Sequence, residues 1–322
     1  MPIERKEVKI EIDDTFDAVI FGKLSRESES TYVYTPNDLR PGGVALYSAS
    51  TCSSCLFKVA LVTKLVEEDK EFLSDLCGKN TQIFTHYDEI PQVVRKSVQE
   101  VTPTKDELIT RCLIQNSPFT TKDIPDVKAY AYVFPEGIYG DYTIDLIKEC
   151  SALGKVYLDA STFLNKVDPK LQLVLFHNHG LIEELAPYCE LIKITEDELV
   201  RLTNNKNLLE SMSEIQSWGA KEVLVTSKNL LYLLDANGNF IRERIAEDYT
   251  INCNHLDVST IITYAIERIT SDPIYSLYTA GAVSMAKLNR PGPVRTCQAE
   301  VDHNLKFFYY YKPVQTIEPV DD

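Results

Sequence analysis

Apolar runs alternate with amphipathic stretches through the middle of the chain, from residue 58 to residue 227. Short β-branched or apolar runs predict strands at residues 16–24, 58–64, 129–134, 155–159, 190–194 and 221–227. The stretches between them, such as 141–153 and 208–218, carry apolar residues at helical spacing. The charged stretch 67–77 is expected to form a further helix. Strands that alternate with helices favour βαβ units, and therefore a largely parallel sheet with helices on both faces.

Other segments depart from this alternation. Residues 82–87 and 93–101 alternate like an exposed hairpin or small sheet, and 27–40 is polar. The segments near 27–40 and 82–115 are therefore candidates for a small lid. Residues 229–246 predict a hairpin that turns at Asn237-Gly238, and the tyrosine-rich run 303–314 alternates like an edge strand. No repeat or low-complexity linker divides the chain, so we expect one domain over 1–322.

Ligands of parallel α/β sheets bind at the carboxyl ends of the strands. The candidate residues near strand ends or helix starts are Glu27, Gly42, Gly43, Asp159, Thr195, Glu198 and Thr226. Gly42-Gly43 before a small-residue helix lets the backbone approach a ligand, although a tight turn into a buried helix explains it equally. Thr195 and Glu198 have capping-box spacing, which needs no catalytic role.

Composition narrows the class of protein. With 48 acidic against 33 basic residues, the net charge of -15 disfavours nucleic acid and anionic membranes as partners. The start of the sequence lacks a signal-peptide pattern, and no apolar window is long enough to span a membrane. Its eight cysteines then predict reduced thiols, in a soluble cytoplasmic protein. The Cys52/Cys55 pair is typical of helix packing, and His177/His179 of a surface loop.

Residues 251–268 form a polar turn that opens into an apolar-striped helix, with Asp257 in its first turn. Asn254 as the N-cap, with Asp257 at the third helical position, is a good helix start by itself. The residues alone therefore assign no chemistry to Asp257.

The order of these features resembles the PfkB, or ribokinase-like, carbohydrate kinases, and within them the myo-inositol kinase branch. The resemblance extends from about residue 16 to residue 293. It is carried by VIFGKLS, PGGVALYSA, FTHYDEIPQVVRKSVQEVTP, VYLDASTFLNKVD, CELIKITEDELVRLT, WGAKEVLVTS and DYTINCNHLDVSTIITYAIER. It implies a ribokinase-like three-layer α/β/α domain with a mostly parallel sheet and a small β lid.

The resemblance also implies roles for individual residues. The aspartate of the family's DTTGAGD signature, which takes the proton from the attacking hydroxyl, matches Asp257. The anion hole would then comprise Cys253, Asn254, His255 and Leu256. Glu27, Gly42, Gly43 and Asp159 would lie near the substrate, and Thr195, Thr226 and Lys228 near the nucleotide. Glu198 would act on Mg²⁺ through water, with ATP as donor and a polyol, sugar or cyclitol as acceptor. Lids of this family often pair between subunits, so a homodimer through the lid is one expectation.

Both phosphate-binding motifs depart from the family pattern. Asn254 and Leu256 replace the two glycines of Gly-Ala-Gly, and Lys228 and Leu231 replace those of a TxGxxG loop. Side chains there restrict the backbone and crowd a phosphate. Two hypotheses follow: a divergent small-molecule kinase, and a catalytically inactive ribokinase-like protein that serves as a ligand sensor or interaction module.

Overall fold

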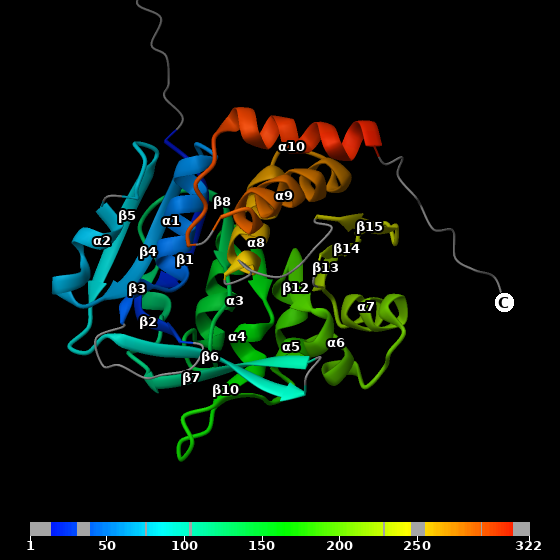
Figure 1. Cartoon of the computed structure of the whole chain (residues 1–322). Coiled ribbons are helices and arrows are strands. Elements are labelled where there is room, and N and C mark those ends of the chain that lie inside the picture. The colour runs from blue at the N-terminus through cyan, green and yellow to red at the C-terminus, as the bar shows by residue number, and fades with distance from the viewer. Residues whose placement is uncertain are drawn as a thin grey trace, which may run out of the picture.

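The computed structural model describes residues 14–30, 39–74, 76–102, 105–227, 229–245, 255–290 and 292–311 (Figure 1). Nine strands form one sheet in the order β15-β14-β13-β12-β9-β8-β1-β4-β5. They are β1 Phe16–Lys23, β4 Val59–Leu65, β5 Thr81–Tyr87, β8 Ala129–Phe134, β9 Lys155–Asp159, β12 Leu191–Thr195, β13 Glu222–Ser227, β14 Leu230–Leu234 and β15 Phe240–Arg244. The seven neighbouring strands β13, β12, β9, β8, β1, β4 and β5 pair in parallel. β14 and β15 continue the sheet beyond β13 as an antiparallel hairpin.

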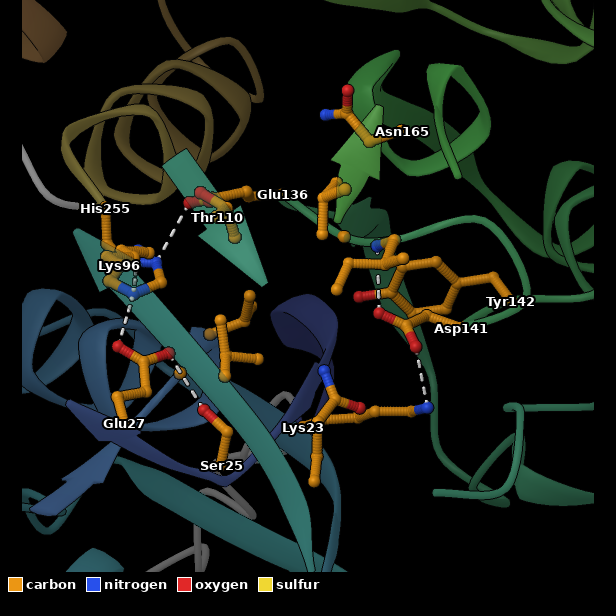
Figure 2. Close-up of a pocket in the computed structure, with 17 residues that line it drawn as sticks. Lys23, Ser25, Glu27, Lys96, Thr110, Glu136, Asp141, Tyr142, Asn165 and His255 are labelled. Carbon is orange, nitrogen blue, oxygen red and sulfur yellow. Dashed lines mark hydrogen bonds and ion pairs between the residues drawn. The ribbon is translucent and has the colours of Figure 1, made fainter. Parts of the chain in front are cut away.

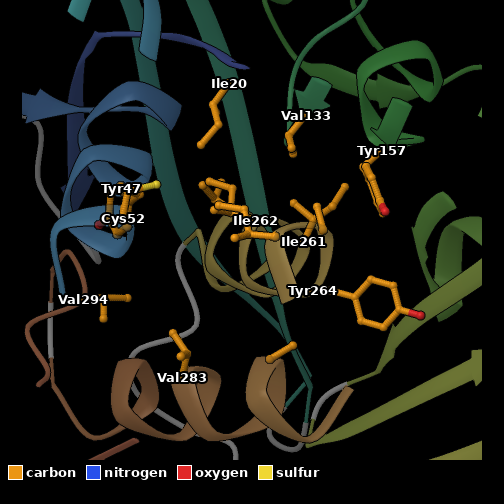
Figure 3. Close-up of a cluster of buried hydrophobic side chains, with 14 of the residues drawn as sticks. Ile20, Tyr47, Cys52, Val133, Tyr157, Ile261, Ile262, Tyr264, Val283 and Val294 are labelled. Carbon is orange, nitrogen blue, oxygen red and sulfur yellow. The ribbon is translucent and has the colours of Figure 1, made fainter. Parts of the chain in front are cut away.

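Side chains of the central strands alternate between two apolar cores. On β1, Ala18 and Ile20 enter one core and Val19 and Phe21 the other, as the two-residue period of a strand requires. The first core lies under α1 Val44–Ser54, α8 Leu256–Glu267 and α9 Pro273–Leu288 (Figure 3). The second lies under α3 Ile144–Leu153, α5 Leu181–Leu185, α6 Glu196–Thr203 and α7 Leu208–Ser217. The result is a three-layer α/β/α sandwich.

A second, four-stranded sheet begins at the carboxyl end of β1. Its order is β3-β2-β6-β7, with β2 Ser25–Ser30, β3 Arg40–Gly42, β6 Gln92–Thr102 and β7 Lys105–Ile114. Beside it lies the hairpin of β10 Asn165–Val167 and β11 Val174–Phe176, and Arg111 of β7 bridges to Leu173 of this hairpin. Of the segments expected to form a lid, 27–30, 40, 92–102 and 105–114 belong to this small sheet, and residues 31–38 lie outside the description.

Three local predictions were wrong. Residues 82–87 do not pair with 93–101, because β5 adds in parallel to β4 at the edge of the main sheet. Residues 303–311 are not an edge strand but belong to α10, Gln298–Tyr311, and residues 312–314 lie outside the description. α10 packs on α9, with Val301 and Leu305 buried and Asn304 donating to the Ala282 carbonyl. Packing on α9 overrides the strand preference of the aromatic run. The charged helix expected at 67–77 is only a 3₁₀ turn, Glu67–Asp69, and the short α2, Glu71–Ser74.

Two further observations concern the residues that the structure describes. Within them, no helix combines the length and apolar character needed to cross a bilayer. Their seven cysteines are free thiols. Cys52 is fully buried in the core under α1, and burial raises the pKa of its thiol, which fits a packing role.

Phe134 offers a test of the second core. Its ring is fully buried, stacks on Phe21 at 4.9 Å and meets the edge of Tyr142 at 5.4 Å. Phe134→Ala should lower the free energy of unfolding by about 3–5 kcal/mol, because the cavity left behind cannot close completely. Urea denaturation measures the change. Tyr130→Ala removes a half-exposed ring from the same strand and should lose less than half as much, and an equal loss would contradict this picture of the core.

Candidate active site

A cavity of about 260 Å³ lies between the small sheet and the carboxyl edge of the main sheet (Figure 2). Its wall includes Lys23, Ser25 and Glu27 at the junction of β1 and β2, and Gln92 and Lys96 of β6. The loop after β8 contributes Glu136 and Asp141, and the start of α8 contributes His255. The Lys23 ammonium is buried, bonds to Asp141 at 2.8 Å and donates to the Asn116 carbonyl at 3.2 Å.

His255 joins the two sheets at one end of this cavity. Its Nδ1 lies 2.9 Å from Glu136 Oε2, and its Nε2 lies 3.1 Å from Glu27 Oε2 and 3.0 Å from Lys96 Nζ. Burial and the Lys96 ammonium lower the pKa of His255, whereas Glu136 and Glu27 raise it, and the balance lies at about 9. Burial raises the pKa of Glu27, but His255 and Lys96 lower it to about 2. The imidazole is therefore a cation between two carboxylates at neutral pH.

The backbone of His255 explains how its ring reaches these partners. His255 is the N-cap of α8 in the left-handed region, at φ 55° and ψ 26°, a conformation that costs a side-chain-bearing residue energy. Asp257 is consequently the second helical residue, so the expectation of Asn254 as N-cap with Asp257 third was wrong. Asn254 and Cys253 lie outside the described residues. Leu256 opens the helix with its side chain buried in the core.

A second charged cluster lies behind the start of α8. The Lys193 ammonium, fully buried on β12, bonds to Asp257 Oδ2 at 2.7 Å and to Asp159 Oδ2 at 3.0 Å. Burial raises the pKa of Asp159, Lys193 lowers it and Asp257 raises it again, to about 6. The Asp257 side chain keeps 27% of its surface exposed, whereas that of Asp159 keeps none. Asp257 is thus the member of the cluster that remains open to a ligand.

Glu198 lies at the start of the next helix, α6. Its Oε2 accepts hydrogen bonds from the backbone and hydroxyl of Thr195 in the predicted capping box, and its Oε1 accepts from Asn165 at 3.1 Å. Among the described residues, no three acidic, histidine or cysteine side chains form a metal cage. Mg²⁺ commonly binds one or two carboxylates and completes its shell with water and substrate phosphates. The placement of Glu198 fits an indirect contact of that kind.

On the expected nucleotide side, the described residues next to Thr226 include apolar side chains of the core. Thr226 ends β13 beside Thr195, and its buried hydroxyl has no hydrogen-bond partner among the described groups. Leu231 pairs with Thr226 across the β13–β14 turn and packs fully buried in the same core as Leu256. The two leucines at glycine positions of the resembling family therefore fill space inside the fold. Lys228 lies outside the described residues.

The structure thus separates the predicted site residues into groups. Glu27, Gly43 and His255 line the cavity, and Gly42 packs against Glu27, whose side chain a Cβ there would meet at 2.7 Å. Asp159 and Asp257 meet at Lys193, and Thr195, Glu198 and Thr226 follow on adjacent strand ends. The sequence reasoning missed Lys193, Lys96 and Glu136. The one available signal was a lysine inside the apolar run of β12.

No family model matches the sequence, and no curated protein matches it. Solved structures do. A pyrophosphate-dependent kinase in the ribokinase family, complexed with a pyrophosphate analog and myo-inositol, has a TM-score of 0.77 at 20% identity, over 89% of this chain and 99% of that one. The chain has the ribokinase fold. This confirms the expected fold class, a three-layer domain with a mostly parallel sheet and a small β lid.

Two further structures share the ribokinase fold with this chain. A pyrophosphate-dependent myo-inositol-1 kinase converted into a myo-inositol-3 kinase has a TM-score of 0.75 at 19% identity, over 92% of this chain and all of that one. Arabidopsis thaliana ribokinase complexed with ribose and ATP has a TM-score of 0.65 at 13% identity, over 91% of this chain and 99% of that one. The structural neighbours are therefore sugar and cyclitol kinases.

The His255 cluster predicts a pH-dependent stability. The pKa of His255 is raised from 6.5 to about 9, so its stabilising effect is complete below pH 6.5 and is lost as the pH rises through 9. Between these values the free energy of unfolding of the wild type should fall by about 3 kcal/mol more than that of His255→Gln. Denaturant titrations at fixed pH measure it. His86→Gln, at a half-exposed histidine, serves as control, and parallel curves for wild type and His255→Gln would refute the prediction.

Proposed function

We propose that the protein is a small-molecule kinase that transfers the terminal phosphoryl group of ATP to a hydroxyl of an uncharged sugar or cyclitol. The observation that carries the proposal is the placement of Asp257. Its partly exposed carboxylate stands at the start of α8, two residues after the cavity-lining His255, and Lys193 fixes its other side. A carboxylate held at the carboxyl edge of an α/β sheet, beside a polar cavity, is suited to accept a proton from a bound hydroxyl.

In the proposed reaction, Asp257 takes the proton as the acceptor oxygen forms its bond to phosphorus. The bond from phosphorus to the bridging oxygen breaks, and its electron pair leaves with ADP. The partial positive charge at the start of α8 favours the transferring group, and Lys193 supplies a full positive charge beside the base. Mg²⁺, which Glu198 would hold through water, neutralises donor phosphates when bound. In this proposal, Asp257 accepts the proton and Lys193 holds the carboxylate of Asp257 in place.

The charges of the cavity support an uncharged acceptor. Lys23 bonds to Asp141, and His255 bonds to both Glu27 and Glu136. The remaining lining cation, Lys96, interacts with both glutamates and lowers the pKa of each. Among the described lining residues, three cations therefore offset three carboxylates. Fixed ionised pairs bind hydroxyl groups well, whereas a phosphate or carboxylate on the acceptor would have to displace one of these carboxylates.

Pyrophosphate is a second candidate for the phosphoryl donor, besides ATP. Thr195 and Thr226 lie where the proposal needs nucleotide contacts, but Leu231 and Leu256 fill space with apolar side chains in the adjoining core. A small donor such as pyrophosphate needs less room than ATP, and a structural neighbour binds a pyrophosphate analog. Both donors therefore belong in the first assay.

The competing hypothesis is a catalytically inactive protein that only binds its ligand. It is favoured by the same substitutions, because His255 and Leu256 stand where the resembling kinases have small residues. Such a protein would bind a polyol without any turnover. A lid that pairs two subunits would be compatible with either function. Sedimentation of the purified chain measures its oligomeric state independently of activity.

Asp257→Asn tests the chemistry. The substitution keeps the shape but removes the proton acceptor, so turnover should fall by about 10²–10⁴-fold. Release of ADP from ATP, or of phosphate from pyrophosphate, is measured with a panel of sugars and cyclitols. Asp272→Asn, at the N-cap of α9, is the control, because Asn caps a helix as well as Asp. Equal turnover by wild type and Asp257→Asn with every pair of substrates would end the kinase proposal.

The acceptor panel tests the charge argument independently. Neutral sugars and cyclitols should be turned over, and their monophosphates should have kcat/KM values at least about 100-fold lower, which is equivalent to about 2.7 kcal/mol. Lys23 and Lys96 would have to give up a carboxylate to bind the extra phosphate. A higher kcat/KM for a phosphorylated acceptor than for its neutral parent would contradict the charge argument.

A further inference from the structure

Asp159 ends strand β9 at the ligand-binding edge, where the resemblance implies a substrate contact. Its side chain is fully buried and both of its carboxylate oxygens are engaged. Oδ1 accepts from the backbone N–H of Ser161 at 3.0 Å, and Oδ2 accepts from Lys193 at 3.0 Å. Neither Asp159 nor Asp257 is among the residues that line the cavity, but the Asp257 side chain keeps 27% of its surface exposed and that of Asp159 keeps none. A carboxylate that is fully buried presents no accessible oxygen to a substrate hydroxyl.

We propose that Asp159 is a positioning residue. Its carboxylate compensates the positive charge of the Lys193 ammonium, so that Asp257 can accept a proton. The inference rests on the proposed kinase function and assigns Asp159 a different role from that of a substrate ligand. Asp257 remains the only member of the cluster that would touch the reacting hydroxyl.

The backbone fixes the geometry of this cluster. Lys193 and Asp159 are direct partners in the parallel pairing of β12 with β9, and the N–H of Ala160 donates to the Lys193 carbonyl at 2.7 Å. Asp257 approaches from a different layer, at the start of α8. The ammonium is thus held by the sheet and by Asp159, while Asp257 comes from the helix that borders the cavity.

The need for two carboxylates follows from the proposed reaction. Before transfer, one buried ammonium faces two ionised carboxylates. When Asp257 takes the proton, its attraction to Lys193 falls, but Lys193 keeps Asp159 as a partner. Glu198 also attracts Lys193 but forms no ion pair with it. Without Asp159, protonation of Asp257 would therefore leave the buried ammonium with no ionised carboxylate bonded to it, which is strongly unfavourable. Lys193 would then hold Asp257 in its ionised form and make it a poor proton acceptor.

Asp159→Asn tests the inference. The isosteric amide keeps the size of the side chain, removes the charge and replaces one of the two acceptor oxygens by an NH2 group. We expect kcat to fall by about 10–100-fold, the range that follows from a poorly positioned or weakened base, with KM within about 3-fold of the wild type. Glu222→Gln removes a different buried carboxylate, which bonds Arg268 and Tyr264 away from the site. It should leave kcat unchanged, and thermal unfolding of both variants shows whether each is folded at the assay temperature.

A second variant separates a charge effect from loss of fold. Asp159→Asn is therefore also introduced into Lys193→Met. Lys193→Met by itself should lower kcat, because Lys193 holds Asp257, but adding Asp159→Asn to it should then change kcat by less than about 3-fold, since the ammonium through which Asp159 acts is gone. A purely structural role predicts that Asp159→Asn lowers kcat by the same factor in both backgrounds, and that result would overturn the inference. A raised KM with unchanged kcat for Asp159→Asn would also overturn it, and would restore Asp159 as a substrate ligand. A wild type that turns over no acceptor with either donor instead refutes the proposed function, and the inference with it.

Discussion

The charges buried at the carboxyl edge of the sheet constrain this protein most strongly, because each buried cation needs a carboxylate from a distant part of the sequence. Lys193 meets Asp159 from the neighbouring strand and Asp257 from α8. These contacts exist only when β9, β12 and α8 are all in their final places. An ion pair of this kind is weak evidence for stability, because desolvation offsets its attraction. Its value lies in fixing where one exposed carboxylate points.

His255 extends the same constraint to the small sheet. Glu27 and Lys96 come from β2 and β6, whereas Glu136 follows β8 of the main sheet. One side chain thus holds both walls of the cavity in a fixed relation. The ring also packs on Tyr47 of α1, with 4.4 Å between ring centroids. Because the residue accepts a left-handed backbone to achieve this, its ring position and the start of α8 are determined together.

The sequence was sufficient for the main architecture and for part of the site. Short apolar and β-branched runs predicted β1 and β8, and the Thr195–Glu198 spacing predicted the start of α6, because these signals are local. The edge position of β5 and the helical tail, α10, depend on contacts with distant elements, so local alternation misled. The partners of Lys193 and His255 could not be predicted from local sequence signals either, because they lie between 34 and 228 positions away along the chain. A charged residue within a buried strand was the only indication.

Leu231 and Leu256 occupy motif positions of the resembling kinases without providing the backbone cradle that glycine forms there. Each stands at a glycine position of the resembling kinases, and both side chains end in one apolar core rather than in an open cradle. A glycine cradle binds phosphate with backbone N–H groups that come close to it. In the proposed kinase, these two leucines would leave less room for a donor, whereas the charges of the acceptor cavity are arranged in pairs. The paired charges of the cavity are therefore the better guide to the substrate.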